Sequence, residues 1–288
     1  MSSPARLPLP AVGALLVNAM VWGLAWWPMR QLEAAGLHPL MATAAIFTLA
    51  VGVLTLWRPT AWREVLTHPS LWVILLAAGT TNAAFNWGVT QGDVVRVVLL
   101  FYLMPLWAVL LARLLLHERI TPMAMARVAL ALGGALMVLW PRQGGFSLTL
   151  SPTDLLGLLG GLSFALNNIM LRRESARSEA ARGLAMFAGG AIVSGVLALS
   201  LQHAHLPPPS PAWMAWVLGL VGVMLAGNLA LQYGASRLPA QATSIIMLTE
   251  ILWATGSALA LGAGHMDMQL ALGGALIIAS AALAALRP

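Results

Sequence analysis

The sequence predicts an all-α integral membrane protein with ten transmembrane helices, arranged as two inverted five-helix repeats around a central cavity. Two observations carry this prediction. Of the 288 residues, 60% are hydrophobic and 8% are charged, with a mean hydropathy of +0.85, which is far from the balance of a soluble domain. The chain also repeats itself, because Asn82 to Gly88 read NAAFNWG and, 146 positions later, Asn228 to Gly234 read NLALQYG.

The spans follow from the length of helix that a bilayer needs, about 20 residues for a core of about 30 Å. The first apolar run is followed by Pro28, Arg30 and Glu33 rather than by a small-residue cleavage site, so we interpret it as a retained helix. Gly and Pro mark the joints between later spans. The ten predicted spans are residues 11–31, 40–57, 71–89, 94–116, 123–140, 155–171, 183–201, 212–234, 240–261 and 269–286.

The repeat divides the spans into two sets of five, residues 11–140 and 153–286, joined by a linker that begins at Pro141. The same shift of 146 positions superposes Trp107 on Trp253 without a gap. Because five is an odd number, the second copy must lie in the bilayer upside down relative to the first. This inverted plan is typical of secondary transporters, which bind a solute near mid-depth between the repeats.

The arginines orient the chain, since lysine does not occur. With a cytoplasmic N-terminus, twelve arginines lie on the inner side and three on the outer side. This positive-inside bias places both termini in the cytoplasm. Scattered along inner loops, the net charge of +6 indicates contact with anionic lipid head groups rather than nucleic-acid binding, which would need one basic surface.

Amides recur within the spans, where lipid offers no hydrogen-bond partner. Asn82 and Asn86 are four residues apart and therefore share one helix face, as do Asn228 and Gln232 in the matching span of the second half. They either bind neighbouring helices together or line the cavity. The first span of each half adds further amides, at Asn18, Asn167 and Asn168.

Glu250 is the acidic residue nearest the middle of a span. A carboxylate there costs roughly 2.5–3.5 kcal/mol on insertion scales, so we expect it to bind a substrate ammonium, to exchange a coupling proton, or to pair with a structural amide. Its counterpart in the first half is Met104, followed by Pro105, and this proline predicts a helix kink. Bent helices expose backbone groups to the cargo of transporters.

Several aromatic residues lie deeper than the tryptophans at the span ends, which we assign to the lipid interface. Trp22, Phe101, Tyr102 and Trp253 either pack between helices or form a wall for a flat aromatic cargo. Together with the amides and Glu250, they complete the predicted substrate-binding set. Its members are Asn18, Trp22, Asn82, Asn86, Phe101, Tyr102, Asn167, Asn168, Asn228, Gln232, Glu250 and Trp253.

At these residues the chain resembles a known family. Trp22-Gly23 in the first span, the segment from Pro105 to His117-Glu118-Arg119-Ile120-Thr121 and the small-residue fifth and tenth spans are similar to the EamA family of the drug/metabolite transporter superfamily. Its resemblance is greatest to the bacterial exporters of aromatic amino acids in that family. It implies inner-membrane export by alternating access, without a cofactor. Where family members often carry a second proline, Ile251 stands.

Other classes of function are less consistent with the sequence. His117-Glu118 is followed by no histidine at position 121, so no zinc-protease motif is present, and a nucleophile elbow is absent. We therefore expect neither an enzyme nor a metal site. The sequence also lacks the repeated charged residues that would form a selectivity ring, so it does not predict a channel. A broad-specificity exporter of drugs or metabolites remains an alternative, because a cavity with few fixed charges rejects few solutes.

Overall fold

The computed structural model describes residues 8–91, 94–140, 151–261 and 268–286, and within these ranges all regular structure is helical. The linker at 141–150, the loop at Gly92 and the arginines at positions 6, 142 and 287 lie outside the described residues. The helices are α1 (Leu9–Ala34), α2 (Pro39–Trp57), α3 (Ala61–Thr67), α4 (Pro69–Gln91), α5 (Val94–Phe101), α6 (Met104–Leu115), α7 (Pro122–Leu139), α8 (Pro152–Arg173), α9 (Glu179–Ser200), α10 (Pro211–Ala235), α11 (Ala240–Met247), α12 (Glu250–Ala260) and α13 (Met268–Leu286).

Every predicted span coincides with helix, although the count of ten crossings remains a prediction. Six stretches are long and apolar enough to cross a membrane by length and composition, namely α1, α2, α8, α9, α10 and the stretch Val97–Leu115 that contains most of α5 and α6. The other four predicted spans coincide with α4, α7, α13 and the pair α11 and α12. The sequence did not predict α3, a short helix in the connection between α2 and α4.

Local sequence explains where many helices begin. Proline occupies the first turn of α2, α7, α8 and α10, a position where its missing N–H removes no helical hydrogen bond. Side-chain caps satisfy other first-turn N–H groups. Thr121 accepts from the N–H of Ala124 ahead of α7, and Ser178 accepts from the N–H of Ala181 in α9. At α8, Ser151 and Asp154 form a reciprocal capping box.

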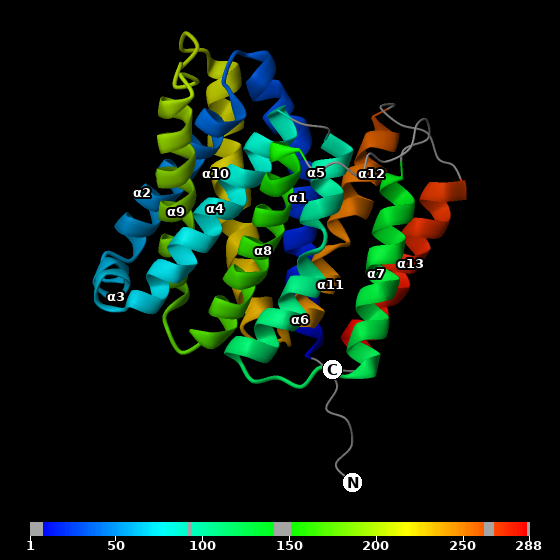
Figure 1. Cartoon of the computed structure of the whole chain (residues 1–288). Coiled ribbons are helices and arrows are strands. Elements are labelled where there is room, and N and C mark those ends of the chain that lie inside the picture. Colours follow the sequence, from blue (N-terminus) through cyan, green and yellow to red (C-terminus); the bar gives the residue numbers. More distant parts are fainter. Residues whose placement is uncertain (1–7, 92–93, 141–150, 262–267, 287–288) are drawn as a thin grey trace.

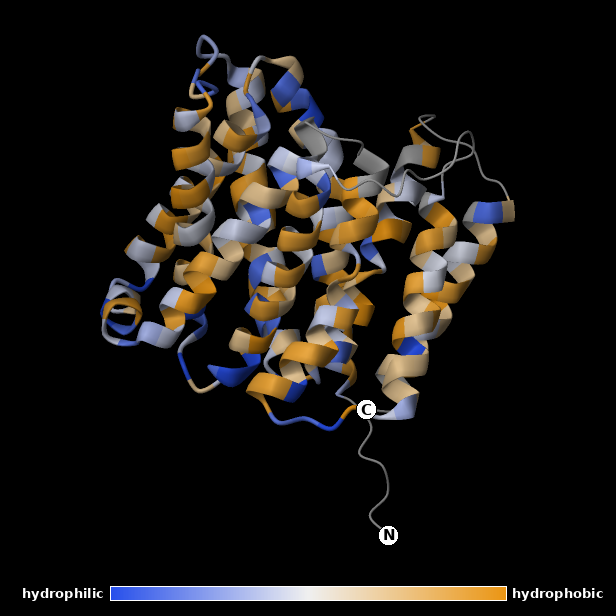
Figure 2. Cartoon of the chain, viewed as in Figure 1, coloured by the Kyte–Doolittle hydropathy of each residue, from blue (hydrophilic) through white to orange (hydrophobic). Residues whose placement is uncertain are grey.

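The helices form one bundle whose long axes run between the same two ends (Figure 1). The pair α7 and α13 lies at one edge, and α2, α3 and α9 lie at the other (Figure 1). The first turn of α1 and the last turn of α13 lie at the same end of the bundle, which agrees with an even number of crossings (Figure 1). Figure 2 shows hydrophobic residues over most of the helix surfaces and hydrophilic residues gathered in the connections at the lower end. Such a surface suits a lipid environment.

Packing between the halves follows a matched pattern. The helix α1 packs against α10 and against α11 and α12, while its counterpart α8 packs against α4 and against α5 and α6. The second helices of the halves, α2 and α9, pack against each other, as do the last helices, α7 and α13. Exchanging the two halves therefore reproduces these pairs of packed helices, which supports the proposal that the halves are repeats.

The structure corrects the prediction for the ninth span, which we expected to be one helix with Glu250 near its middle. Instead α11 ends at Met247 and α12 begins at Glu250. In the first half α5 ends at Phe101 and α6 begins at Met104, 146 positions earlier in both cases. The expected kink thus lies just before Pro105, which occupies the first turn of α6.

Both interruptions use the same hydrogen bonds. The N–H of Leu103 donates to the carbonyl of Leu100 at 3.3 Å, and the N–H of Thr249 donates to that of Ile246 at 3.0 Å. Such bonds to the third preceding residue tighten the backbone into a 3₁₀-type turn. In the second half the hydroxyl of Thr249 also donates to the carbonyl of Ile246, at 2.7 Å. This side-chain bond competes with the helical pattern, so the interruption forms without a proline.

Candidate functional site

A cavity of about 850 Å³ lies between helices of both halves. Residues of α1, α2, α4 and α5 line it from the first half, and residues of α8 to α12 line it from the second. The lining extends from Asn18 and Asn228 to Arg30, Glu33 and Pro39, where α1 connects to α2. That connection lies at the upper end of the bundle in Figure 1. The cavity therefore reaches from the interior toward the end opposite the first turn of α1.

Most of the residues predicted to bind substrate line this cavity. Their helices are far apart in the sequence, and the fold brings their side chains around one space. They are Asn18, Trp22, Asn82, Asn86, Phe101, Tyr102, Asn167, Asn228 and Glu250.

Three predicted residues lie elsewhere. Asn168 and Gln232 are fully buried between helices and do not line the cavity. Trp253 is 41% exposed and lines a different, shallower groove with Val12, Leu16 and Leu24 on the outside of the bundle. Asn168 directly follows Asn167 and therefore points to another side of α8. Gln232 and Trp253 lie one turn after the cavity residues Asn228 and Glu250, so their placement depends on how each helix is rotated and packed, which the sequence does not give.

Glu250 and Tyr102 form a hydrogen bond at the centre of the site, in which the Tyr102 hydroxyl donates to the carboxylate. The two residues come from the two helix interruptions, since Tyr102 follows α5 and Glu250 begins α12. The first turn of a helix carries the positive end of the helix dipole, which favours a carboxylate. The interruption before α12 therefore offsets part of the cost of placing Glu250 inside the bundle.

Phenylalanine rings form an aromatic wall beside this pair. The ring of Phe101 lies 4.9 Å from that of Phe85 and 5.9 Å from that of Phe164, measured between centroids. A second pair, Phe47 and Phe187, packs edge to face at 5.0 Å. All five rings line the cavity, and edge-to-face contacts of this kind are favourable for aromatic pairs.

Sequence reasoning missed four of these rings, namely Phe47, Phe85, Phe164 and Phe187. The helix spacing held a signal for two of them. Phe85 lies three residues after Asn82, and Phe164 lies three residues before Asn167, so each shares a helix face with a predicted cavity residue. Phe47 and Phe187 offer no comparable signal, because no polar residue that we had singled out lies three or four positions away.

The amides of the first half use their NH₂ groups on neighbouring acceptors. Asn82 donates to the carbonyl of Ala78 at 2.9 Å, and Asn86 donates to the hydroxyl of Thr43 at 2.9 Å. Asn18 donates to the carbonyl of Gly227 at 2.7 Å, which ties α1 to α10. Asn86 and Asn18 thus bind two helices together and also line the cavity, whereas the hydrogen bond of Asn82 stays within α4. The structural and the cavity-lining roles of these amides therefore do not exclude each other.

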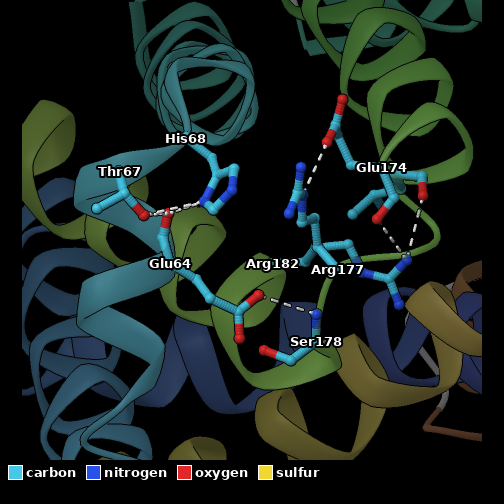
Figure 3. Close-up of polar contacts among 8 residues, drawn as sticks. Glu64, Thr67, His68, Glu174, Arg177, Ser178 and Arg182 are labelled. Carbon is cyan, nitrogen blue, oxygen red and sulfur yellow. Dashed lines mark hydrogen bonds and ion pairs between the residues drawn. The ribbon is translucent and has the colours of Figure 1, made fainter.

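Polar contacts close the opposite end of the bundle. Arg172 of α8 forms an ion pair with Glu118 at 2.6 Å. Figure 3 shows Arg177 paired with Glu174 and the Glu64 carboxylate accepting from the N–H of Ser178, at 3.2 Å. These contacts join the connection between α8 and α9 to α3 and to the segment after α6. The described residues hold no group of three or more His, Cys, Asp or Glu side chains that could bind a metal ion.

Comparisons with known proteins agree with this architecture. A structure titled only as the crystal structure of a protein matches with a TM-score of 0.77 and 20% identity over 97% of each chain, which concerns the fold alone. The profile of the EamA-like transporter family matches residues 9–140. An uncharacterized transporter of Pseudomonas aeruginosa is 31% identical over 132 residues, 43% of this chain and 44% of the relative. One of Helicobacter pylori is 24% identical over 218 residues, 74% of this chain and 72% of the relative.

The long apolar helices indicate a multi-pass membrane protein, and a cavity lies between them. Residues 9–140, slightly less than half of the chain, match the EamA-like transporter family, and the relatives above are named as transporters. The match spans less than half of the length of the Pseudomonas relative, and the names of these relatives state no substrate.

Proposed function

We propose that the protein is a secondary transporter that exports amino acids, aromatic ones foremost, across the bacterial inner membrane by alternating access. Both termini lie in the cytoplasm in this proposal, and residues 11–140 and 153–286 are inverted repeats. The observation that carries the proposal is the cavity of about 850 Å³ in which a carboxylate, amides and an aromatic wall surround one space. Cavities of about 300–1,000 Å³ are typical of sites that bind small molecules.

The chemistry of the lining suits an aromatic amino acid. The ring would lie against Phe85, Phe101 and Phe164, where aromatic contacts are favourable. The ammonium group would bind the carboxyl group of Glu250, which lines the same cavity. Rocking of the helices that line the cavity would then expose it to the other side of the membrane. The matched packing of the halves and their matched interruptions support such a movement.

A counterflow panel in proteoliposomes tests the substrate. Vesicles loaded with one unlabelled solute are assayed for uptake of the same labelled solute, with aromatic amino acids, small neutral amino acids, quaternary amines and nucleosides as separate arms. We expect phenylalanine, tyrosine and tryptophan to exchange fastest. Exchange restricted to nucleosides or to small amino acids would contradict the proposal.

A second candidate is the export of lipophilic cations. It is favoured by the position of the charges, because Glu250 lies deep in the cavity whereas Arg30 lies toward its mouth. A cation with a flat ring would bind the carboxylate and the aromatic wall and need no further partner. Fast exchange of the quaternary amines, with no exchange of amino acids, would establish this alternative.

Glu250 is the residue whose replacement tests the mechanism most directly. The variant Glu250→Gln keeps the shape of the side chain but removes a charged hydrogen bond, which contributes about 1.5–3 kcal/mol. We expect the KM for phenylalanine to rise roughly 10- to 100-fold and any acceleration by a pH gradient to disappear. The matched control is Glu33→Gln at the mouth of the cavity, which should have a much smaller effect. Unchanged transport and unchanged pH dependence would remove Glu250 from the mechanism.

A further inference from the structure

A chain of hydrogen bonds leads from a buried arginine to the wall of the cavity. The Nε–H of Arg182 on α9 donates to Oε1 of Gln232 on α10 at 3.1 Å. Nε2 of Gln232 donates to Oδ1 of Asn228 at 2.7 Å, and Nδ2 of Asn228 donates to the Met186 sulfur at 3.2 Å. Arg182 and Gln232 are buried outside the cavity, whereas Asn228 and Met186 line it.

The direction of this chain follows from the chemistry of its first member. A guanidinium group has donors and no acceptor, so Gln232 must turn its carbonyl oxygen toward Arg182. Its NH₂ group then points to Asn228, and only the carbonyl oxygen of Asn228 can accept from it. Asn228 is left with its NH₂ group directed at Met186 and the cavity. The arginine therefore decides which end of a cavity amide is available to a solute.

Arg182 is itself held in place. Nη1 donates to the carbonyl of Leu171 at 3.3 Å. It also donates to the carbonyl of Glu174 at 3.4 Å, just after the end of α8 (Figure 3). Only 2% of the residue is exposed. Because these carbonyls belong to backbone, the guanidinium group cannot turn away without losing bonds that the buried charge requires. The first member of the chain is thus a fixed reference for the two amides that follow.

The present partner of the Asn228 NH₂ group is a weak one. A thioether sulfur is a poor acceptor, whereas a carboxylate forms hydrogen bonds roughly twice as strong as those between neutral groups. A solute carboxylate that reached Asn228 would displace Met186, whose unbranched side chain adapts readily.

Other polar atoms at the cavity are hydrogen-bond acceptors, in contrast to the donating NH₂ group of Asn228. The NH₂ group of Asn18 donates to the carbonyl of Gly227, and the buried Oδ1 of Asn18 has no hydrogen-bond partner among the described residues. Glu250 is an acceptor when ionised. Acceptors suit the ammonium group of a solute, and a directed NH₂ group suits its carboxylate. The cavity thus holds the two complementary polarities that an α-amino acid needs.

We propose that Asn228 binds the substrate carboxylate, and that Arg182 and Gln232 are positioning residues that hold its NH₂ group toward the cavity. This assignment rests on the proposed function, the transport of amino acids. It explains why Gln232, an amide predicted to bind substrate, lies behind the cavity wall. It also gives the buried charge of Arg182 a role in selecting between substrates with and without a carboxylate.

The variant Gln232→Glu tests the proposal. A glutamate at this position pairs with Arg182 but has no N–H to donate, so the Asn228 amide turns its NH₂ group to the new carboxylate and its oxygen to the cavity. Binding to the purified protein in detergent is measured by calorimetry for phenylalanine, 3-phenylpropionate and phenethylamine. We expect Kd to rise roughly 10-fold for the two carboxylates and to stay within about twofold for phenethylamine, which lacks one.

A second variant distinguishes the loss of the NH₂ group from a general folding defect. Asn228→Asp removes the same NH₂ group without touching Arg182 or Gln232, and we expect the same selective loss of the two carboxylates. Equal weakening of all three ligands in both variants would assign Arg182, Gln232 and Asn228 a structural role and overturn the proposal. An unchanged ratio of affinities in variants that melt near the wild-type temperature would overturn it as well.

The same titrations separate this inference from the proposed function. If the wild-type protein binds phenylalanine and both variants keep its preference over phenethylamine, the carboxylate assignment alone fails. If the wild-type protein binds neither phenylalanine nor 3-phenylpropionate, amino acid transport fails and the assignment fails with it.

Discussion

At the scale of single residues, Gly23 shows how closely the two halves approach each other. A Cβ atom at this position would lie 2.7 Å from the carbonyl oxygen of Glu250 and 2.6 Å from Cβ of Trp253. No side chain fits there without moving α1 away from α12. The glycine of the Trp22-Gly23 pair is therefore a packing residue, although both residues of the pair line the cavity.

We predict that Gly23→Ala destabilises the protein by about 1–3 kcal/mol, the usual cost of overpacking. Thermal unfolding in detergent measures this. Gly13 is a matched control on the same helix, because nothing lies within 4 Å of a Cβ added there. Gly13→Ala should stabilise α1 by up to about 1 kcal/mol through helix propensity. Equal melting temperatures for the two variants would show that α1 and α12 do not pack as described.

His38 makes stability depend on pH at the mouth of the cavity. Burial lowers the pKa of His38 from 6.5, with the neighbouring His203 lowering it further and Glu33 opposing the shift. The two imidazole rings stack with centroids 4.1 Å apart, and Nδ1 of His38 accepts from the N–H of Leu40 at the start of α2. Protonation at Nδ1 would remove that cap.

Because the folded state lowers this pKa, the unfolded chain binds the proton more readily below pH 6.5. The contribution of His38 to stability is therefore present above that pH and is lost as the pH falls through it. We predict a melting temperature a few degrees lower at pH 5 than at pH 7.5 in detergent. In His38→Asn, which keeps a capping oxygen and does not titrate, part of this drop should disappear. An undiminished drop would place the dependence elsewhere.

At the scale of elements, the paired helix interruptions are the feature that builds the site. They bring Tyr102 and Glu250 together and leave a helix N-terminus behind the carboxylate. Only the first interruption has a proline, at Pro105 in the first turn of α6. Since the second forms with Ile251 at the corresponding position, proline is not required for this geometry.

We predict that Pro105→Ala keeps the interruption. A proline in the first turn replaces no helical hydrogen bond, so its removal costs only the entropy that it takes from the unfolded chain, about 0.4–1 kcal/mol. Thermal unfolding should show this small loss, and phenylalanine should bind with nearly unchanged Kd. A loss of binding would mean that the proline itself, rather than the surrounding packing, holds α5 and α6 apart.

At the scale of the whole molecule, the distribution of arginine predicts the topology in the membrane. The connection between α8 and α9 holds Arg177, and the connection between α9 and α10 holds His205. If α9 crosses the membrane, these connections lie on opposite sides, with Arg177 in the cytoplasm. The absence of cysteine from the sequence makes single introduced thiols easy to follow.

We predict that an impermeant maleimide added to intact cells labels His205→Cys but not Arg177→Cys. Thr60→Cys, in the connection between α2 and α3, should resemble Arg177→Cys, because both connections belong to the arginine-rich side. Permeabilised cells provide the control, since all three variants should then react. Labelling of Thr60→Cys and His205→Cys from the same side would contradict the inverted arrangement, because these residues follow the second long helix of each half.

Much of the architecture could be predicted because it depends on composition and period. A helix of about 20 apolar residues crosses the lipid core with its backbone hydrogen bonds satisfied internally. For this reason each predicted span coincides with helix. Polar residues in such spans are costly, and nine of the predicted site residues line the cavity. The placement of Asn168, Gln232 and Trp253 could not be predicted, because it depends on how each helix is rotated about its axis.

The sequence by itself determined that this chain is a helical membrane protein and that buried amides and one carboxylate need partners, and it predicted that the two halves are repeats. These properties are local or compositional, since each follows from what lipid does to an isolated segment. Only the tertiary structure decided that the ninth span is interrupted before Glu250, that Tyr102 is its partner, and that Arg182 directs Asn228 through Gln232. Those features arise from contacts between segments distant in sequence, whose geometry no single helix contains.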